Sequence, residues 1–595
     1  MAGISRRNFL KMLGFASIAI PSVGGTLGAT VFEYIGQSYY GKLTYQALDP
    51  KNSSNFVNPL NVPSTNGGYM GILYRPGQFD IYAQDNMDEY IPGIKTKSWD
   101  FVVNYNGNTY VDPIIVVRKG DQITTTLHNN LPPSTNRYAV SPAATRMEII
   151  HWHGLYVPWT QDGHPLYQIA PGQTYNYNFT VYNRGSTYWY HTHVMSYSAM
   201  HDWYGLRSMF IVEDENDDKL RKALDLTLGE TEIPLLIQDT IFDEYGNLVF
   251  APDMMDYFMG YFGNQITVNG VVNPYLEVDT RVYRFRIVNS SNARIYRLSF
   301  VKNGLGPNIP FYIIGSDGGL LDKPYQVYEA FIGVAERLDI LLDLRNFNPG
   351  DVIFLQTQHF DPYDAEPGMP LYMTQQQEFG ANAAGSQWYY YGYNGTMMGA
   401  LNYLPENAQF NILKLVVKNK VSYDLPIPEE LAPPIEPIDI SGADTRQLVL
   451  APNVQMMQWM INGMTFNLYQ IPITVQKGET VIWEITNVDQ SMPHPFHFHA
   501  GLFQVLERRN SVPQIAALAV DNKGRLPSDL GWKDTVLIWP GETIRIAMSF
   551  TGLLSGTTTA PDMNSTAFAG RQIYLMHCHN FEHEDIGFML NYAVE

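Results

Sequence analysis

Ten of the fourteen histidines in this 595-residue chain lie in four short motifs, and the only cysteine lies inside the last of them. The motifs read HWHG, HTH, HPFHFH and HCHNFEH, and they begin at His151, His191, His494 and His577. Residues i and i+2 of a β-strand point to the same face, so each His-x-His presents two imidazoles side by side. Two motifs lie early in the chain and two at its end. We therefore expect their site to close across an interface between the first and last parts of the chain.

A metal centre is the chemistry that these side chains favour. A lone His-x-His usually marks a polar strand face or an adventitious zinc ion, but four clusters in one chain reverse that expectation. A structural zinc site needs four ligands and a catalytic one three, far fewer than this set offers. Imidazole also suits copper, and two imidazoles with one thiolate form the trigonal blue-copper set. On a strand, Cys578 faces away from His577 and His579, so its thiolate would connect one metal to a second site through adjacent peptide units.

With these residues in place, the chain resembles three-domain multicopper oxidases of the laccase type, and bacterial copper-efflux and spore-coat oxidases more than fungal laccases. The resemblance covers nearly all of the mature chain and implies four copper ions: one type 1, one type 2 and two type 3. The ligands it implies are His494, Cys578 and His583 for type 1, His151 and His497 for type 2, and His153, His191, His193, His499, His577 and His579 for type 3. All eleven are present, which argues against the copper-free structural relatives of this fold.

The position after the last motif departs from the efflux and spore-coat enzymes, which carry an axial methionine five residues after the final histidine. Here Phe588 stands at that position. Phenylalanine has no lone pair, so we expect a three-coordinate type 1 copper with a raised reduction potential. Met589 follows, and on a strand it would point to the opposite face. A one-residue slip that made Met589 the ligand is the alternative.

Two carboxylates match acidic positions that support proton delivery in the resembling oxidases. These are Asp162 and Glu584, and we predict that they supply protons for the reduction of dioxygen. The alternatives are a turn-capping residue for Asp162, which precedes a glycine, and a solvated surface carboxylate for Glu584. The other histidines match no family ligand and are predicted to be surface or loop residues, with the first two named here as possible outer-shell groups: His164, His201, His128 and His359.

The resemblance implies that phenolic or other aromatic donors lose one electron at a time to type 1 copper, at an exposed edge of His583, and that dioxygen is reduced to water at the trinuclear cluster. The alternative is a metal-ion oxidase for Cu(I), Fe(II) or Mn(II), and a third reading is a non-enzymatic copper-storage or structural role. Carboxylates or methionines near His583, in place of an open apolar pocket, would favour a metal ion. The 24 methionines are scattered singly or in pairs, so no dedicated copper-resistance insert is evident.

Charge and the N-terminus bear on partners and location. The net charge is 38 − 58 = −20, and no Lys or Arg cluster appears beyond the N-terminus, so nucleic acid is not an expected partner.

Arg6 and Arg7 precede an apolar run that is interrupted by Gly, Ser and Pro. This pattern resembles a twin-arginine export signal. An ordinary signal peptide or an anchor is the alternative. We expect the export machinery as a partner, a periplasmic, cell-surface or secreted location, and a membrane anchor only if the segment stays uncleaved. A single cysteine in an exported chain forms no internal disulfide.

The segments that carry the motifs read as short strands. Runs such as DPIIVVRKGDQITTTLHNNL alternate apolar and polar residues between turn residues, and a faint strand–turn–strand repeat ending in Asn recurs in three places. We expect an all-β chain of three cupredoxin-like Greek-key β-sandwich or barrel domains. A helical connector is expected at 213–226 and a long surface loop at 360–405. The predicted divisions are a signal segment at 1–35, domains at 45–215, 216–420 and 446–595, and a linker at 421–445.

Overall fold

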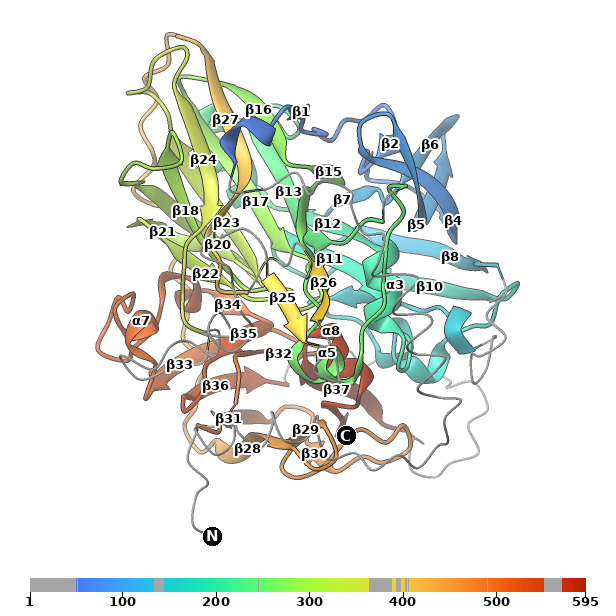
Figure 1. Ribbon diagram of the computed structural model, residues 1–595. Helices are drawn as coiled ribbons and strands as arrows, with labels where there is room; N and C mark the ends of the chain where they lie inside the picture. The colour runs from blue at the N-terminus through green and yellow to red at the C-terminus, as the bar shows by residue number, and fades with distance from the viewer. Residues whose placement is uncertain are drawn as a thin grey trace.

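The computed structural model describes residues 50, 52–132, 144–243, 245–362, 388–391, 397–401, 404, 406–489, 491–550 and 570–595. The predicted signal segment 1–35 lies outside these residues. The described chain is built mainly from strands in several sheets with few helices, which confirms the predicted all-β class. Figure 1 shows three groups of sheets, coloured blue to teal, green to yellow and orange to red, that meet near helices α3, α5 and α8.

The first group contains two sheets. One has six strands in the order β10 (Thr174–Thr180), β8 (Gln122–Asn130), β4 (Phe79–Ile91), β5 (Ile94–Tyr105), β6 (Asn108–Val111) and β2 (Gly68–Tyr69). The other has five, in the order β3 (Ile72–Tyr74), β7 (Ile114–Arg118), β12 (Arg207–Glu213), β11 (Ser186–Thr192) and β9 (Ile150–His153). Strand β8 alternates buried and partly exposed residues, which is the period-two pattern that the sequence shows.

The middle group also pairs two sheets, each of seven strands. The first runs β1 (Asn58–Pro59), β16 (Pro274–Asp279), β27 (Phe410–Asn419), β24 (Val352–Thr357), β18 (Tyr296–Lys302) and β19 (Asn308–Ile309), with β22 (Ala330–Ile332) also on β18. The second runs β15 (Val271–Val272), β14 (Gln265–Val268), β13 (Glu232–Thr240), β17 (Val282–Asn289), β23 (Arg337–Asp343), β20 (Phe311–Ser316) and β21 (Gly319–Val327).

The last group has a six-stranded and a five-stranded sheet. The first runs β29 (Gln458–Ile461), β28 (Asp444–Asn453), β31 (Thr480–Asn487), β36 (Thr543–Ser549), β33 (Phe503–Arg509) and β34 (Trp532–Lys533). The second runs β30 (Ile473–Val475), β38 (Met589–Val594), β37 (Gln572–Cys578), β32 (His494–Phe498) and β35 (Thr535–Ile538). One apolar core holds side chains of the first and last groups together, Trp152 and Trp483 among them, and most of the middle group forms a core of its own.

The described helices are short. They are α3 (Ser198–Tyr204), α4 (Glu215–Leu224), α5 (Met254–Met259), α7 (Pro513–Ala516) and α8 (Phe581–Asp585), with 3-10 turns at Ser53–Asn55, Ala144–Arg146, Trp159–Gln161, Pro165–Tyr167 and Pro527–Leu530. Helix α4 is the helical connector expected from the sequence. Among the described residues, no helix has the length and apolar character needed to span a bilayer.

Two features differ from the sequence expectations. The segment 360–405, predicted to be a loop, contains two antiparallel strands, β25 (Trp388–Tyr391) and β26 (Met397–Leu401). Residues 58–59, placed by the sequence in the first domain, form β1 on the edge of the middle group's sheet, in parallel with β16. The Phe56 ring next to it is buried edge-on against Phe354 at 5.5 Å. Residues 56–59 lie there because Phe56 packs against Phe354 and β1 pairs with β16, and both partners are distant in sequence.

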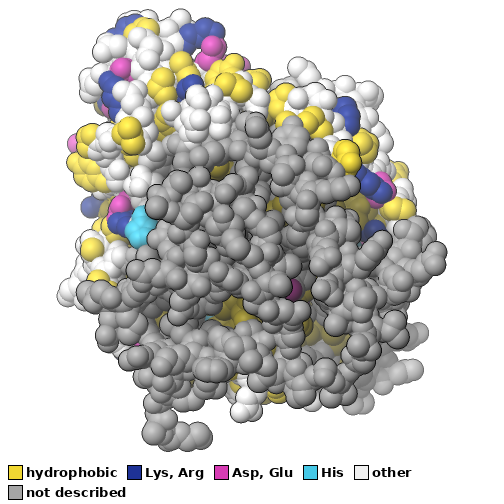
Figure 2. Space-filling view, viewed as in Figure 1, with side chains coloured by type: hydrophobic (Ala, Val, Ile, Leu, Met, Phe, Trp, Pro, Cys, Tyr) yellow, Lys and Arg dark blue, Asp and Glu magenta, His cyan; other side chains and the backbone are white. Residues whose placement is uncertain are grey.

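On the face seen in Figure 2, basic and acidic side chains lie among apolar ones in the upper part.

Candidate metal centre

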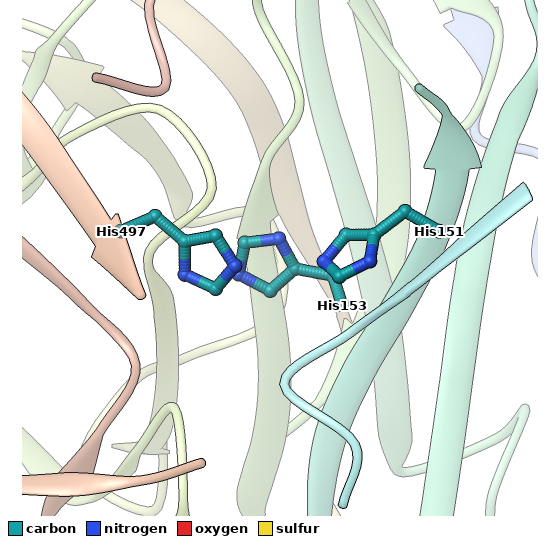
Figure 3. A group of neighbouring side chains, drawn as sticks. All are labelled: His151, His153 and His497. Carbon is teal, nitrogen blue, oxygen red and sulfur yellow. The ribbon is translucent and has the colours of Figure 1, made fainter. Parts of the chain in front are cut away.

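Strand pairing brings the four motifs together two by two. In the first group, β9 and β11 are antiparallel neighbours, with His151 opposite His191. In the last group, β32 and β37 are antiparallel neighbours, with His497 opposite His577. The two pairs then face each other across the interface of the groups. Figure 3 shows this meeting for three rings, with His151 and His153 reaching from one side and His497 from the other.

Eight buried histidines form three groups, two of which share His153, and within each group the ligand atoms lie within 4.8 Å of one another. The groups are His151, His153 and His497; His153, His191 and His579; and His193, His499 and His577. Each group combines motifs from both ends of the chain. The second and third groups together hold the six predicted type 3 ligands, and the first group adds His151 and His497, the predicted type 2 ligands.

The ring nitrogens of this cluster are arranged for a metal. Burial, reinforced by neighbouring histidines, lowers the pKa of His151, His191 and His497 well below 6.5, so the rings are neutral. Their Nδ1 atoms donate to backbone oxygens, of Asp162 at 2.5 Å, Thr192 at 2.8 Å and Asp534 at 2.8 Å. Their Nε2 atoms are buried without a partner among the described residues. Such groups cost about 1–3 kcal/mol each when left unsatisfied, and deprotonated imidazole nitrogens are what metals require.

Two ring nitrogens from different motifs approach each other closely inside the cluster. His499 Nε2 and His577 Nε2 lie 3.1 Å apart. His577 Nδ1 is held by the Cys578 backbone oxygen at 3.2 Å, and His499 Nδ1 by Asp162 Oδ2 at 2.6 Å. With each Nδ1 engaged elsewhere, the two Nε2 atoms meet inside the cluster, where a metal ion can bind both in place of the hydrogen bond between them. The residues therefore fit copper.

A separate buried triad has the composition of a blue-copper site. Cys578 Sγ lies 3.5 Å from His494 Nδ1 and 3.5 Å from His583 Nδ1. His494 Nε2 hydrogen-bonds Ser491 Oγ at 3.0 Å, which leaves Nδ1 for a metal. Burial raises the pKa of the Cys578 thiol and lowers the pKa of His583 to about 3. A thiol held protonated by burial becomes a thiolate when a metal ion binds it.

Phe588 lies against this triad. Its buried ring is 4.9 Å from the His494 ring and 5.9 Å from the Trp459 ring. Met589 begins β38 and pairs with His577, the residue that faces the histidine cluster. This arrangement supports Phe588 and not Met589 as the side chain over the type 1 position.

The exposed edge that we expected on His583 is absent. His583 is fully buried, and its Nε2 donates to the backbone oxygen of Phe258 at 3.0 Å. Phe258 belongs to α5, and Trp459 Nε1 donates to the same oxygen at 2.7 Å. The Trp459 and Phe258 rings are stacked at 4.9 Å. The expectation was wrong because α5, 325 residues earlier in the chain, covers the ring.

The two predicted acids lie at the histidine cluster, and their environments separate them. Burial raises the pKa of Asp162 well above its usual value. Burial acts on Glu584 in the same direction, but His193 and His577 outweigh it, so the pKa of Glu584 is lowered. Glu584 Oε2 lies 3.2 Å from His577 Nδ1 and is buried, so the alternative of a solvated surface carboxylate is wrong. The pKa values of the two carboxyls are thus shifted in opposite directions, which is the arrangement that proton transfer uses.

Two of the four remaining histidines are buried, and they are the two predicted as possible outer-shell groups. His164 Nε2 hydrogen-bonds Asn591 Oδ1 at 2.9 Å, linking the first and last groups, and His201 Nδ1 pairs with Glu148 at 2.9 Å. His128 stacks on Tyr82, and His359 is exposed. Asp534 and Phe258, which hold cluster and triad rings, were not found from the sequence. Each acts on a ring more than 30 residues away, so no local pattern marks it.

Known proteins are similar to this chain in sequence and in fold. Two family models described as multicopper oxidase match residues 94–217 and 441–595. The structure of McoA multicopper oxidase from the hyperthermophile Aquifex aeolicus is 33% identical, with 90% of this chain and 99% of that one covered and a TM-score of 0.71. Laccase of Bacillus subtilis is 29% identical over 539 residues, 83% of this chain and 89% of the relative. Cell division protein FtsP of Photorhabdus laumondii is 28% identical, covering 75% of this chain and 77% of the relative.

This chain belongs to the multicopper oxidase family and is an oxidoreductase of that family. Multicopper oxidases use dioxygen and a reducing substrate, and copper is the metal that the family implies.

Proposed function

We propose that the chain takes single electrons from a small donor at the triad of His494, Cys578 and His583 and reduces dioxygen to water at the eight-histidine cluster. The observation that carries this is the joining of the two sites by one strand end, where Cys578 lies between His577 and His579. Four bound copper ions, one type 1, one type 2 and two type 3, would supply the one-electron carriers and the oxygen-reducing centre. The peptide groups on either side of Cys578 give the electrons a covalent path.

Protons for this reaction are proposed to come from Asp162 and Glu584. Reduction of one dioxygen to two waters consumes four protons at a site from which bulk water is excluded. Asp162 is buried behind His499, and Glu584 lies beside His193 and His577. Each carboxyl therefore contacts a ring of the cluster, where it can relay a proton toward the cluster.

The surroundings of His583 favour a reduced metal ion as donor. Because α5 covers the ring, an aromatic donor cannot contact it directly. Helix α5 carries Met254, which is 57% exposed, and the partly buried Met255 and Met259. Asp253 and Asp256 lie in the same turn, where burial and Asp253 raise the pKa of Asp256 to about 7. Thioether sulfur suits Cu(I), and carboxylates suit harder ions such as Mn(II).

A phenolic or aromatic donor is the second candidate, and the similarity to proteins named laccase supports it. A non-enzymatic role, such as the name of the FtsP relative suggests for that protein, is less well supported because all eleven candidate ligands are present here.

Oxygen uptake by the copper-loaded protein tests these proposals. Cu(I), Fe(II) and Mn(II) are compared with a panel of phenols, in the wild type and in a Met255→Leu/Met259→Leu variant that keeps the apolar volume and removes both sulfurs. A metal-ion oxidase should lose about tenfold in kcat/KM for Cu(I), as expected for loss of weak ligands, with phenol oxidation unchanged.

Two further variants serve as controls for the donor test. Met464→Leu, a partly exposed methionine outside α5, should change neither activity. Cys578→Ser should abolish both the blue colour and turnover, and a colourless, active wild type would overturn the assignment. Equal rates on Cu(I) in all methionine variants, with efficient phenol oxidation, would favour the laccase reading.

We further propose that the chain is exported by the twin-arginine machinery to the periplasm, cell surface or medium, remaining anchored only if the signal stays uncleaved. The support is the sequence around Arg6 and Arg7. Changing both to lysine should trap folded protein in the cytoplasm, as read by cell fractionation, while Arg75→Lys on the surface should not. Normal export of the double variant would exclude the twin-arginine route.

A further inference from the structure

The middle group of sheets contributes no candidate copper ligand, yet one of its arginines reaches the histidine cluster. Arg337 in β23 is fully buried and forms a two-pronged ion pair with Asp534, using NH1 at 2.8 Å to Oδ1 and NH2 to Oδ2. Its Nε donates to the Thr187 backbone oxygen at 3.0 Å, in the first group. One guanidinium therefore connects all three groups of sheets.

Asp534 passes this connection to two rings of the cluster. Its Oδ1 accepts from His153 Nε2 at 3.0 Å, and its backbone oxygen accepts from His497 Nδ1 at 2.8 Å. The two rings come from opposite ends of the chain and are stacked at 3.8 Å. Asp534 thus sets the relative orientation of a first-group and a last-group histidine.

His153 differs from the other cluster histidines in the nitrogen that it offers. Of the six cluster rings that make a hydrogen bond, five use Nδ1 and leave Nε2 toward the cluster: His151, His191, His497, His499 and His577. His153 alone gives its Nε2 to a residue outside the cluster, and its Nδ1 is buried without a partner among the described residues. Because a neutral imidazole carries one proton, a fixed acceptor at Nε2 leaves Nδ1 as the lone pair.

The chain is shaped around this ion pair. Gly154 follows His153 with φ +83°, and a Cβ built there would lie 2.3 Å from Asp534 Oδ2 and 3.2 Å from Arg337 NH2. The glycine of the HWHG motif therefore provides the space in which the pair approaches the β9 strand. Asp317 holds the opposite side, accepting from Arg337 N at 2.8 Å and from Lys533 at 3.1 Å.

We propose that Arg337 and Asp534 are positioning residues that select the Nδ1-ligating form of His153, and that through them the ligand-free middle group controls copper loading of the histidine cluster. The carboxylate needs the guanidinium, because a buried, unpaired charge is strongly destabilising. Outer partners of this kind fix tautomer and ring orientation, and their loss typically weakens metal binding about 10- to 100-fold. This inference rests on the copper-ligand assignment and is independent of the donor.

The test reloads apo-protein with Cu(I) against a competing chelator and measures copper per chain; after oxidation in air to Cu(II), the type 2 electron-paramagnetic signal and the blue type 1 absorption are recorded. Asp534→Asn keeps the shape, but its amide can turn an N–H toward His153 Nε2. Both Asp534→Asn and Arg337→Gln should lose about 10- to 100-fold in copper affinity at the cluster, with the blue absorption intact. Arg337→Lys should fall between them and the wild type.

Arg284→Gln is the matched control. Arg284 is equally buried in the middle group and pairs with Asp217 and Asp339, away from the candidate ligands. It should lower the thermal midpoint without changing copper affinity. Wild-type affinity in Asp534→Asn and Arg337→Gln, or an equal loss in Arg284→Gln, would overturn the inference. If Arg337→Gln fails to fold, Asp534→Asn and Arg337→Lys decide it. A wild type that takes up no copper would overturn the ligand assignment itself.

Discussion

At the type 1 triad, Phe588 stands where the oxidases that this chain resembles carry an axial methionine. Its ring lies 4.9 Å from the His494 ring and offers no electron pair. Phe588→Met should introduce a weak thioether ligand that favours Cu(II). A tenfold preference would lower the type 1 potential by about 59 mV, and oxidation of poorly reducing donors should slow several-fold.

Redox titration measures this change, with Phe588→Leu as a control that removes the ring but adds no ligand. The copper content of the histidine cluster should not change in either variant. An unchanged or higher potential in Phe588→Met would mean that Phe588 does not lie over the copper.

At the scale of elements, His164 ties the turn after β9 to strand β38 through Asn591. Its Nδ1 accepts from Leu166 N at 3.1 Å, so the ring must stay neutral to keep both bonds. Burial lowers its pKa to about 4 from 6.5. The unfolded chain therefore binds a proton that the folded chain refuses between these values, and stability falls as the pH falls from about 6.5 to about 4. The loss is on the order of 3 kcal/mol.

His164→Gln should flatten this part of the pH dependence. The measurement is the thermal midpoint of copper-loaded protein between pH 4 and 6.5, where bound copper keeps the ligand histidines from titrating. His359→Gln, at an exposed histidine, should keep the wild-type slope. A wild-type slope in His164→Gln would show that this ring does not limit acid stability.

At the scale of the molecule, the sequence predicts what depends on short spacing. The period of two places His151 with His153 and His577 with His579 on shared faces, and the all-β class follows from alternation and turn residues. The cover over His583 and the Arg337–Asp534 pair could not be predicted, because their partners lie 325 and 197 residues apart. Strand β1 could not be predicted either, because a two-residue strand at a sheet edge has no periodicity to detect.

Strand β1 also has a consequence for the order of events during synthesis. Residues 58–59 leave the ribosome early, but their pairing partner in β16 is made more than 200 residues later, and Phe56 must wait longer still for Phe354. Residues 56–59 therefore lack their native partners while the first sheets are forming. Closing such a long loop is slow, so the pairing of β1 with β16 forms only after the middle group of sheets has been made. Residues 56–59 are thereby kept unpaired until most of the protein has been made.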